Sequence, residues 1–231
     1  MDWEKYKDYK AEDLKNLERQ SRERYGQAVE FAQASRFEEA YQQFEESFLM
    51  ASASLGDVNK VTNNILSDCI DTLVRTNKNA YIDEIIALSY RYLGIELLLG
   101  RENTPQVINK IFLLAERLSE QGRRMEAITV YENLLESVKM VYRRDDPILV
   151  KCLENITDLY QITDSTSSIL ITHLEELYDL YQSFYDESEL AYAQVVEKLG
   201  QVYQDTHRPI EAKRMAEKAQ RLYGAYHSKF Q

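Results

Sequence analysis

The chain has 231 residues, 44% of them hydrophobic, with 7 Gly, 3 Pro and a formal net charge of −11. Gly and Pro mark the turns that all-β folds need in number, so their scarcity excludes such folds and a standard Gly-rich phosphate loop. The acidic balance would repel a phosphate backbone, which disfavours nucleic acid as a partner. We therefore expect an all-α protein with enough apolar residues for a sizeable core.

The N-terminal sequence and the cysteines bear on the compartment. The start, Met1-Asp2-Trp3-Glu4-Lys5, is too charged for a secretory signal. No apolar run reaches the roughly 18 residues of a membrane helix, because charged residues interrupt the nearest candidate at 82–99. Cys69 and Cys152 lie far apart in the sequence and predict buried thiols in a reducing compartment. These features predict a cytoplasmic protein without membrane insertion.

Helical periodicity runs through nearly the whole chain, and short breaks divide it into about ten helices of roughly 14–22 residues. Thr104-Pro105 and Asp146-Pro147 predict helix starts, since each places a capping residue before Pro at the first helical position. Gly100 and Gly122 predict helix ends. The breaks fall at 35–36, 56–57, 77–79, 100–104, 122–123, 144–146, 163–167, 185–188 and 205–208.

One short string, Arg-x-x-Glu-Ala, occurs at 36–40, 123–127 and 208–212. Its copies are 87 and 85 residues apart, so each interval fits two repeats of about 42–44 residues. The intermediate positions near 84 and 169 are occupied by Ile85 and Ile169, which we expect in the place of the alanine. One continuous domain over 1–231 follows, with 1–20 as a cap or helix extension and repeats at roughly 21–57, 58–103, 104–146, 147–187 and 188–227.

Small and aromatic residues recur at fixed spacing around each alanine of the string. The positions are Ala28, Phe31, Phe37, Ala40, Phe44 and Ser47 in the first repeat, Leu114, Ala115, Leu118, Gly122, Ala127 and Tyr131 in the third, and Leu199, Gly200, Tyr203, Pro209, Ala212, Ala216 and Ala219 in the fifth. This spacing resembles the tetratricopeptide repeat. The longer period and the linker at 142–147 resemble its kinesin-light-chain type.

The resemblance implies a right-handed superhelical α-solenoid of about five antiparallel helix pairs. Small residues let the two helices of a pair cross closely, and aromatic residues fill the neighbouring turn. The fourth repeat matches only through Ile156 and Tyr160, and the second barely matches. An armadillo-like or HEAT-like array has a similar period and is the structural alternative.

Residues that could carry chemistry do not converge on a site. None of His173, His207 and His227 has a metal-ligand spacing, and the His173/Glu176 pair is expected on a polar helix face. Cys152 lies among apolar residues and is expected in the core. We predict no enzyme, no metal and no cofactor. The 17 tyrosines are expected mainly to pack between helices, with an aromatic-lined binding surface as the alternative.

In the resembled family, the first helix of each pair lines a concave groove that holds a peptide or a partner's helix. The groove-facing positions, counted from the small residues, are Arg22, Tyr25, Val29, Asn109, Phe112, Glu116, Lys151, Glu154, Asp158, Gln161, Gln194, Glu197, Gln201 and Gln204. Tyr25 and Val29 stand where a Lys/Asn pair would clamp a carboxylate. The later positions are acidic and Gln-rich, which suits a basic or amide-rich segment. The alternative is that these faces are simply solvated.

The leading hypothesis is a non-enzymatic adaptor or scaffold that binds another protein or peptide. A self-assembling structural protein is an alternative, because Leu222, Tyr223 and Tyr226 of the C-terminal repeat remain to be covered, for example by a second copy. An intracellular peptide-sensing regulator is the other alternative.

Overall fold

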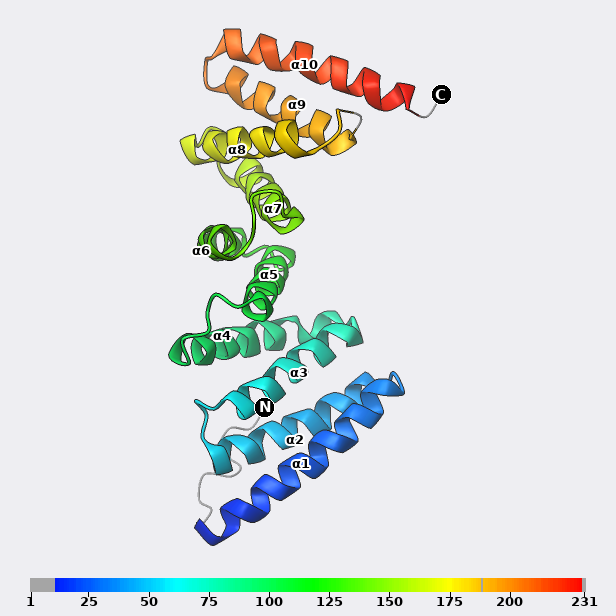
Figure 1. Cartoon of the computed structure of the whole chain (residues 1–231), viewed down its shortest axis with the longest axis vertical. Helices are drawn as coiled ribbons and strands as arrows, with labels where there is room; N and C mark the ends of the chain where they lie inside the picture. The colour runs from blue at the N-terminus through cyan, green and yellow to red at the C-terminus, as the bar shows by residue number, and fades with distance from the viewer. Residues whose placement is uncertain (1–10, 188, 230–231) are drawn as a thin grey trace. The chain divides into compact units, whose positions relative to one another are not determined.

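A computed structural model describes residues 11–187 and 189–229, and within these ranges the chain forms ten α-helices, one short 3-10 helix and no strand (Figure 1). The elements are α1 Ala11–Gln33, α2 Phe37–Leu55, α3 Lys60–Thr76, η1 Asn79–Tyr81, α4 Ile82–Leu98, α5 Pro105–Glu120, α6 Arg124–Val141, α7 Pro147–Thr163, α8 Ser168–Phe184, α9 Leu190–Asp205 and α10 Pro209–Ser228. The all-α prediction and the predicted breaks are confirmed. No helix in the described part combines the length and apolar content that crossing a membrane requires.

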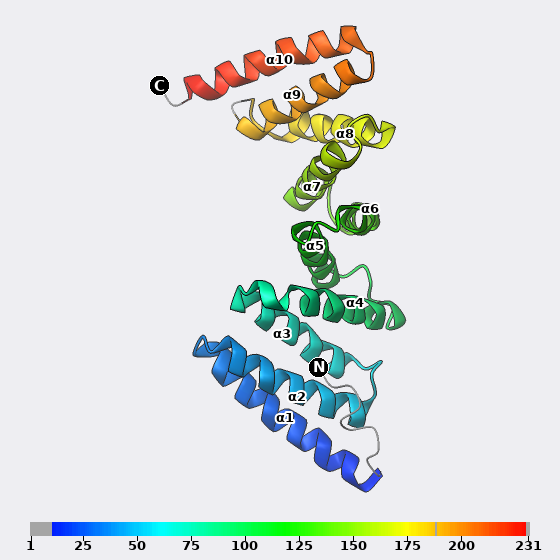
Figure 2. The ribbon, with the colours of Figure 1, turned by 180° about the vertical axis from the view of Figure 1, so that it is seen from behind.

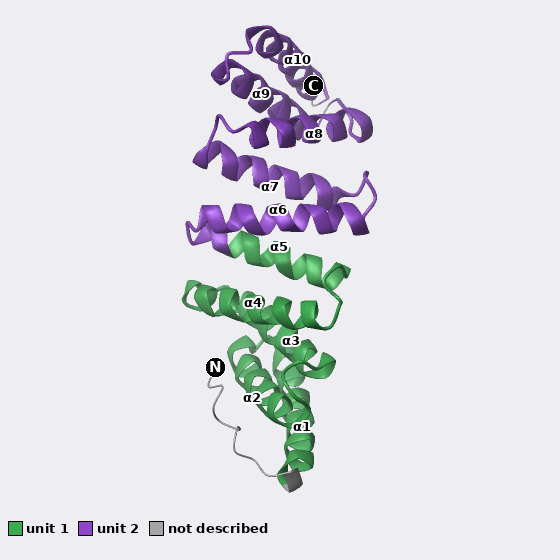
Figure 3. Cartoon of the chain, turned by 90° about the vertical axis from the view of Figure 1, so that its left-hand side faces the viewer, with its two compact units in different colours: residues 1–117 green, residues 118–231 purple. Residues whose placement is uncertain are grey.

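The chain divides into two compact units, residues 1–117 and 118–231 (Figure 3). In unit 1, α1 packs on α2, α2 on α3 and α3 on α4, in chain order (Figure 2). In unit 2, each helix from α6 to α10 packs on the next. Sequential packing of helices joined by short loops is the arrangement of a helical repeat. A single continuous domain over 1–231 stays a prediction.

Side-chain contacts between equivalent helices display the repeat period. The Tyr25 hydroxyl donates to Asp68, and the Tyr41 hydroxyl donates to Glu84, each over 43 residues. In unit 2, the ammonium group of Lys218 donates to the Tyr178 hydroxyl over 40 residues. These separations agree with the predicted period of about 42 residues.

Small residues bring α1 and α2 together in unit 1. The Ser21 hydroxyl donates to the Ser47 carbonyl at 2.8 Å, and the Ser47 hydroxyl donates back to the Ser21 carbonyl at 2.8 Å. Ala28 and Ala40 are fully buried at the same interface. Each hydroxyl is satisfied across the interface, so the two helices approach closely without an unpaired polar group.

A glycine serves this purpose in unit 2. A Cβ atom at Gly200 of α9 would lie 3.1 Å from the Cβ of Met215 in α10. This contact would be tighter than most Cβ contacts, so the glycine lets α9 and α10 cross closely. One expected core position is wrong, because Ile169 is 47% exposed and the buried residue is its neighbour Leu170. Helix α8 starts at Ser168, so its apolar face begins one residue later than the period predicts. Ile85 is buried as expected.

Each copy of the Arg-x-x-Glu-Ala string follows the same helix ending. The residue before the arginine has left-handed backbone, and the arginine N–H donates to the carbonyl five residues earlier, as in a Schellman motif. The left-handed residues are Ser35 (φ 58°), Gly122 (φ 73°) and His207 (φ 59°). The arginine bonds measure 2.9 Å to Phe31, 2.9 Å to Leu118 and 2.8 Å to Tyr203.

The Arg and Glu of the string form an ion pair at the start of the next helix in all three copies. The arginine guanidinium contacts the glutamate three residues later, at 2.9 Å for Arg36/Glu39, 2.7 Å for Arg123/Glu126 and 3.0 Å for Arg208/Glu211. Residues three positions apart are neighbours on a helix surface, so this spacing brings the Glu side chain to the Arg. The ion pair thereby connects the turn between the two helices to the first turn of the second helix. The string is thus a turn signature.

The predicted helix caps are confirmed in one case and wrong in the other. The Asp146 carboxylate accepts from the Ile148 N–H at 3.0 Å, with Pro147 at the first position of α7. The Thr104 hydroxyl is buried without a hydrogen-bond partner. At α5 only the Thr104 carbonyl contributes, by accepting from the Ile108 N–H at 3.0 Å. Gly100 and Gly122 end their helices with φ of 65° and 73°, as expected.

Candidate partner-binding surface

In the described part of unit 1, two cavities lie between α1 and α3, the first helices of the first two repeats, and Tyr25 lines both. We name them the Val61 cavity, of about 430 Å³, and the Asp68 cavity, of about 280 Å³. Because one side chain forms a wall of each, the cavities are neighbours along the same helix–helix surface.

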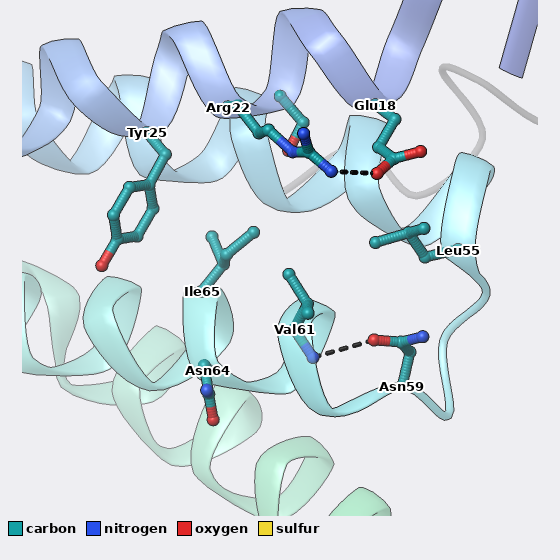
Figure 4. Close-up of a pocket in the computed structure, with 9 residues that line it drawn as sticks. Glu18, Arg22, Tyr25, Leu55, Asn59, Val61, Asn64 and Ile65 are labelled. Carbon is teal, nitrogen blue, oxygen red and sulfur yellow. Dashed lines mark hydrogen bonds and ion pairs between the residues drawn. The ribbon is translucent and has the colours of Figure 1, made fainter. Parts of the chain in front are cut away.

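The Val61 cavity is apolar inside and polar at its edge. Figure 4 shows Val61 and Ile65 directed from α3 toward α1, and Leu55 directed in from the end of α2. Val61 is 55% exposed, although its neighbour on the same helix face, Ile65, is buried. The edge carries the ion pair between Glu18 and Arg22 of α1. The cavity therefore offers an apolar surface to solvent beside fixed charges.

The first turn of α3 sets the position of Val61. The Asn59 side chain accepts a hydrogen bond from the Val61 N–H at 2.8 Å and caps the helix (Figure 4). A cap of this kind satisfies one of the free N–H groups at a helix start and fixes the entering chain. The exposed Val61 side chain therefore projects from a capped helix start.

The Asp68 cavity has a carboxylate at its shared end. The Tyr25 hydroxyl donates to Asp68 Oδ2 at 3.0 Å, and the Tyr25 ring meets Phe44 edge-on with centroids 5.3 Å apart. Burial raises the pKa of the Asp68 carboxyl above its usual value, against the lowering effect of the Tyr25 hydrogen bond. The Tyr25 hydroxyl is a neutral donor, so it orients the Asp68 carboxylate without cancelling its negative charge.

A buried lysine holds the other acid of this cavity. Lys110 of α5 is 7% exposed, and its ammonium group donates to the Asp71 carboxylate and to the Ser67 carbonyl, the latter at 3.1 Å. Arg75 also lines this cavity and is exposed. Asp71 is thus paired with a positively charged side chain, whereas Asp68 accepts a hydrogen bond from an uncharged tyrosine hydroxyl.

The predicted groove residues of unit 1 have different environments. Arg22 lines the Val61 cavity, Val29 lines the Asp68 cavity, and Tyr25 lines both. Asn109 is exposed and Glu116 is half-buried. Phe112 is only 6% exposed, so its expected place on an open surface is corrected. Helix α5 buries side chains on more than one face, and one periodic apolar stripe could not indicate this.

The predicted groove residues of unit 2 are partly engaged with neighbouring helices. Glu154 accepts from the Tyr181 hydroxyl at 2.6 Å, and Glu197 accepts from the Tyr223 hydroxyl at 2.6 Å. Asp158 pairs with Lys198, and the Gln201 amide donates to Asp205 at 2.8 Å. Lys151, Gln194 and Gln204 are exposed, and Gln161 is half-buried.

Tyrosines connect successive helices of unit 2 through glutamates. The bonds Tyr181–Glu154 and Tyr223–Glu197 join α8 to α7 and α10 to α9, and the Tyr203 hydroxyl donates to Glu175 of α8 at 2.7 Å. Burial and the adjacent carboxylates raise the pKa of Tyr181 and of Tyr203, and the Glu197 bond raises that of Tyr223 to about 12. These tyrosines act in packing between helices.

The histidine and cysteine candidates are structural in their surroundings. His173 was expected on a polar face, but it is 7% exposed and its Nε2 lies 2.9 Å from Glu132 Oε1, because α8 turns this residue toward α6. Cys69 and Cys152 are free and buried, and burial raises the pKa of the Cys152 thiol to about 12. Residues 11–187 and 189–229 contain no group of three or more His, Cys, Asp or Glu placed to hold a metal ion.

The sequence matches no protein-family model and no curated protein. Solved structures of similar fold do exist. The TPR-like repeats assigned to a kinesin light chain of Podosopora anserina align with 87% of this chain and 94% of their own, at 15% identity and a TM-score of 0.62.

Two further structures align over similar lengths. BtubC (BKLC) from P. vanneervenii aligns with 94% of this chain and 92% of its own, at 16% identity and a TM-score of 0.58. MamA 41-end from Desulfovibrio magneticus RS-1 aligns with 90% of this chain and 96% of its own, at 13% identity and a TM-score of 0.55. Identities this low establish the fold alone. The chain has the fold of a tetratricopeptide-like helical repeat protein.

Proposed function

We propose that the chain is a non-enzymatic protein–protein interaction module, an adaptor or scaffold, which holds a segment of a partner on the surface made by the first helices of its repeats. The observation that carries the proposal is the pair of cavities between α1 and α3. A solenoid exposes the equivalent faces of successive repeats side by side, and this arrangement suits the binding of an extended partner.

The charge on the first helices of unit 2 supports a basic or amide-rich partner. Glu154 and Glu197 are each fixed by a tyrosine hydroxyl, which orients the carboxylate without neutralising it. Gln194 and Gln204 are exposed on the same helix as Glu197 and offer amide groups. Carboxylates held in place beside amides favour a partner that brings ammonium, guanidinium or amide groups.

Site-specific photo-crosslinking in the cells that make the protein tests the location of the partner. A photoreactive amino acid replaces Arg22 or Gln194 on first helices, and in control variants it replaces Tyr90 of α4 or Glu136 of α6 on second helices. We expect one partner to form adducts at the first-helix positions and at neither control position. Equal adducts at all four positions, or adducts at the second helices alone, would reject the proposal.

Once the partner is identified, charge variants test the acidic positions. Glu154→Gln with Glu197→Gln removes two charges and keeps an acceptor for each tyrosine, so the fold is retained. The matched control, Asp83→Asn with Glu136→Gln, removes two charges from exposed second-helix positions. Affinity for a basic partner should fall at least about tenfold in the first variant only. Equal affinities of the two variants would count against a basic segment.

A further inference from the structure

The two cavities between α1 and α3 differ in chemistry, although Tyr25 lines both. The Val61 cavity is bounded by Val61, Ile65 and Leu55, and the Asp68 cavity has a carboxylate at the end that Tyr25 closes. Val61 and Asp68 are seven residues apart on one helix, which corresponds to about 10 Å along its axis. One short ligand could reach both.

The apolar half is open to solvent. A valine that is 55% exposed at the mouth of a cavity, above a buried Ile65, leaves apolar surface in contact with water. Covering such surface with an apolar side chain is favourable by roughly 25 cal/mol per Å². The fixed Glu18–Arg22 pair at the edge offers polar contacts to a backbone that lies across it.

The charged half has basic side chains nearby, because Arg75 lines the Asp68 cavity and Lys110 lies beside it, but neither is paired with Asp68. Within the part of the chain that the structure describes, no Lys or Arg forms an ion pair with Asp68, while the nearby Lys110 is occupied by Asp71 and by the Ser67 carbonyl. The Tyr25 hydroxyl orients Asp68 Oδ2 and leaves its negative charge in place. Burial and the neighbouring Asp71 carboxylate raise the pKa of Asp68, while the Tyr25 hydrogen bond and the more distant Lys110 lower it. A cation from a ligand would supply the missing partner.

We propose that these cavities form one two-part peptide site, which takes an apolar side chain over Val61 and a Lys or Arg side chain at Asp68. The inference rests on the proposed function and specifies the partner segment at this surface. The spacing of about 10 Å fits residues i and i+7 of a helical ligand, or residues i and i+3 of an extended one.

Fluorescence anisotropy with labelled synthetic peptides tests the site on the full chain. The probes are Gln/Ser/Ala-based peptides of about twelve residues that carry Leu and Lys at i and i+7 or at i and i+3. In matched peptides, Glu replaces Lys or Ala replaces Leu. We expect a Leu/Lys peptide to bind at least about tenfold more tightly than either matched peptide. Equal binding of the Lys and Glu peptides, or no binding by any probe, would overturn the inference.

Two protein variants localise the binding. Asp68→Asn keeps an acceptor for Tyr25 and should remove the preference for Lys over Glu in the peptide. Val61→Ser changes an exposed side chain and should remove the preference for Leu over Ala. Glu136→Gln in unit 2 is the control and should change neither preference. If a probe peptide binds both variants with the same affinity as the unchanged protein, the two-part site is wrong. The proposed function is judged separately, by crosslinking at Gln194 in unit 2.

Discussion

The first helices of the repeats are joined differently in the two units. In unit 1, a tyrosine hydroxyl links α1 to α3 and the space around it is left as two cavities. In unit 2, the ion pair between Lys198 and Asp158 links α9 to α7, and the rings of Tyr181 of α8 and Tyr192 of α9 stack with centroids 5.7 Å apart. Equivalent first helices can thus be joined by a tyrosine–carboxylate hydrogen bond next to cavities or by an ion pair, according to the side chains at the contact.

The helix cores of the units also differ in polarity. Unit 1 buries Glu96 of α4 completely, where the Asn63 amide donates to it at 2.8 Å and Arg101 Nε lies at an ion-pair distance of 3.1 Å. Unit 2 relies on the close approach of α9 and α10 at Gly200. One unit therefore depends on a buried charge, and the other on the absence of a side chain.

Glu96→Ala should have the largest effect on stability and should act in unit 1. It leaves the Arg101 guanidinium and the Asn63 amide without their partner in a buried setting, at a cost of about 3 kcal/mol. Hydrogen exchange read by mass spectrometry should show faster exchange in α3 and α4 and little change in α9 and α10.

A paired replacement separates the charge from the packing. Glu96→Met together with Arg101→Met removes both charges and keeps their volume, so most of the lost protection should return. If Glu96→Ala leaves exchange in α3 and α4 unchanged, the buried pair contributes nothing to the stability of unit 1.

Gly200→Val should destabilise unit 2 locally, as Glu96→Ala should destabilise unit 1 locally. The new side chain would overlap Met215 and push α10 away from α9, which costs about 2 kcal/mol. Gly224→Val is the matched control, because a Cβ at Gly224 meets nothing within 4 Å. Equal exchange in α9 and α10 for the two variants would show that the close crossing at Gly200 is unimportant.

Local signals made much of the fold predictable from the sequence. The Arg-x-x-Glu-Ala string encodes a helix ending, a chain reversal and an ion pair within nine residues, so each copy marks a hairpin without knowledge of distant contacts. The second and fourth repeats could not be recognised from this string, because the turns between their helices are formed by other residues. One has Asn77 in left-handed backbone before a short 3-10 helix, and the other caps α8 with Ser167.

The candidate site was harder to predict, because its two walls are 43 residues apart in sequence. Arg22, Tyr25 and Val29 could be named from the first repeat, whose small residues set the register. Val61 and Asp68 could not, because the second repeat matched the pattern too weakly to assign its groove face. Counting one period of 43 residues from Tyr25 would have reached Asp68.

Substitutions that add or remove glycine at the turns test whether both units reverse their chains in the same way. Gly122→Ala places a Cβ in left-handed backbone and should destabilise unit 2 by about 1 kcal/mol. Ser35→Gly in unit 1 and His207→Gly in unit 2 relieve the same strain and should each stabilise by up to about 1 kcal/mol. Urea unfolding followed by circular dichroism measures the three changes. Destabilisation by either glycine variant would mean that the turns are not equivalent.

Tyr223→Phe should have the smallest effect and a distinctive dependence on pH. At neutral pH it removes one partly exposed hydrogen bond to Glu197, which is worth about 0.5 kcal/mol. The pKa of Tyr223 is raised to about 12, above the value of about 10 in an unfolded chain. Between these values the folded state binds more protons than the unfolded state, so stability falls as the pH rises. Urea unfolding across this range should show a shallower fall for Tyr223→Phe than for the control Tyr90→Phe. Parallel curves would mean that the hydroxyl of Tyr223 titrates alike in both states, and that the bond between α10 and α9 contributes nothing to the stability of unit 2.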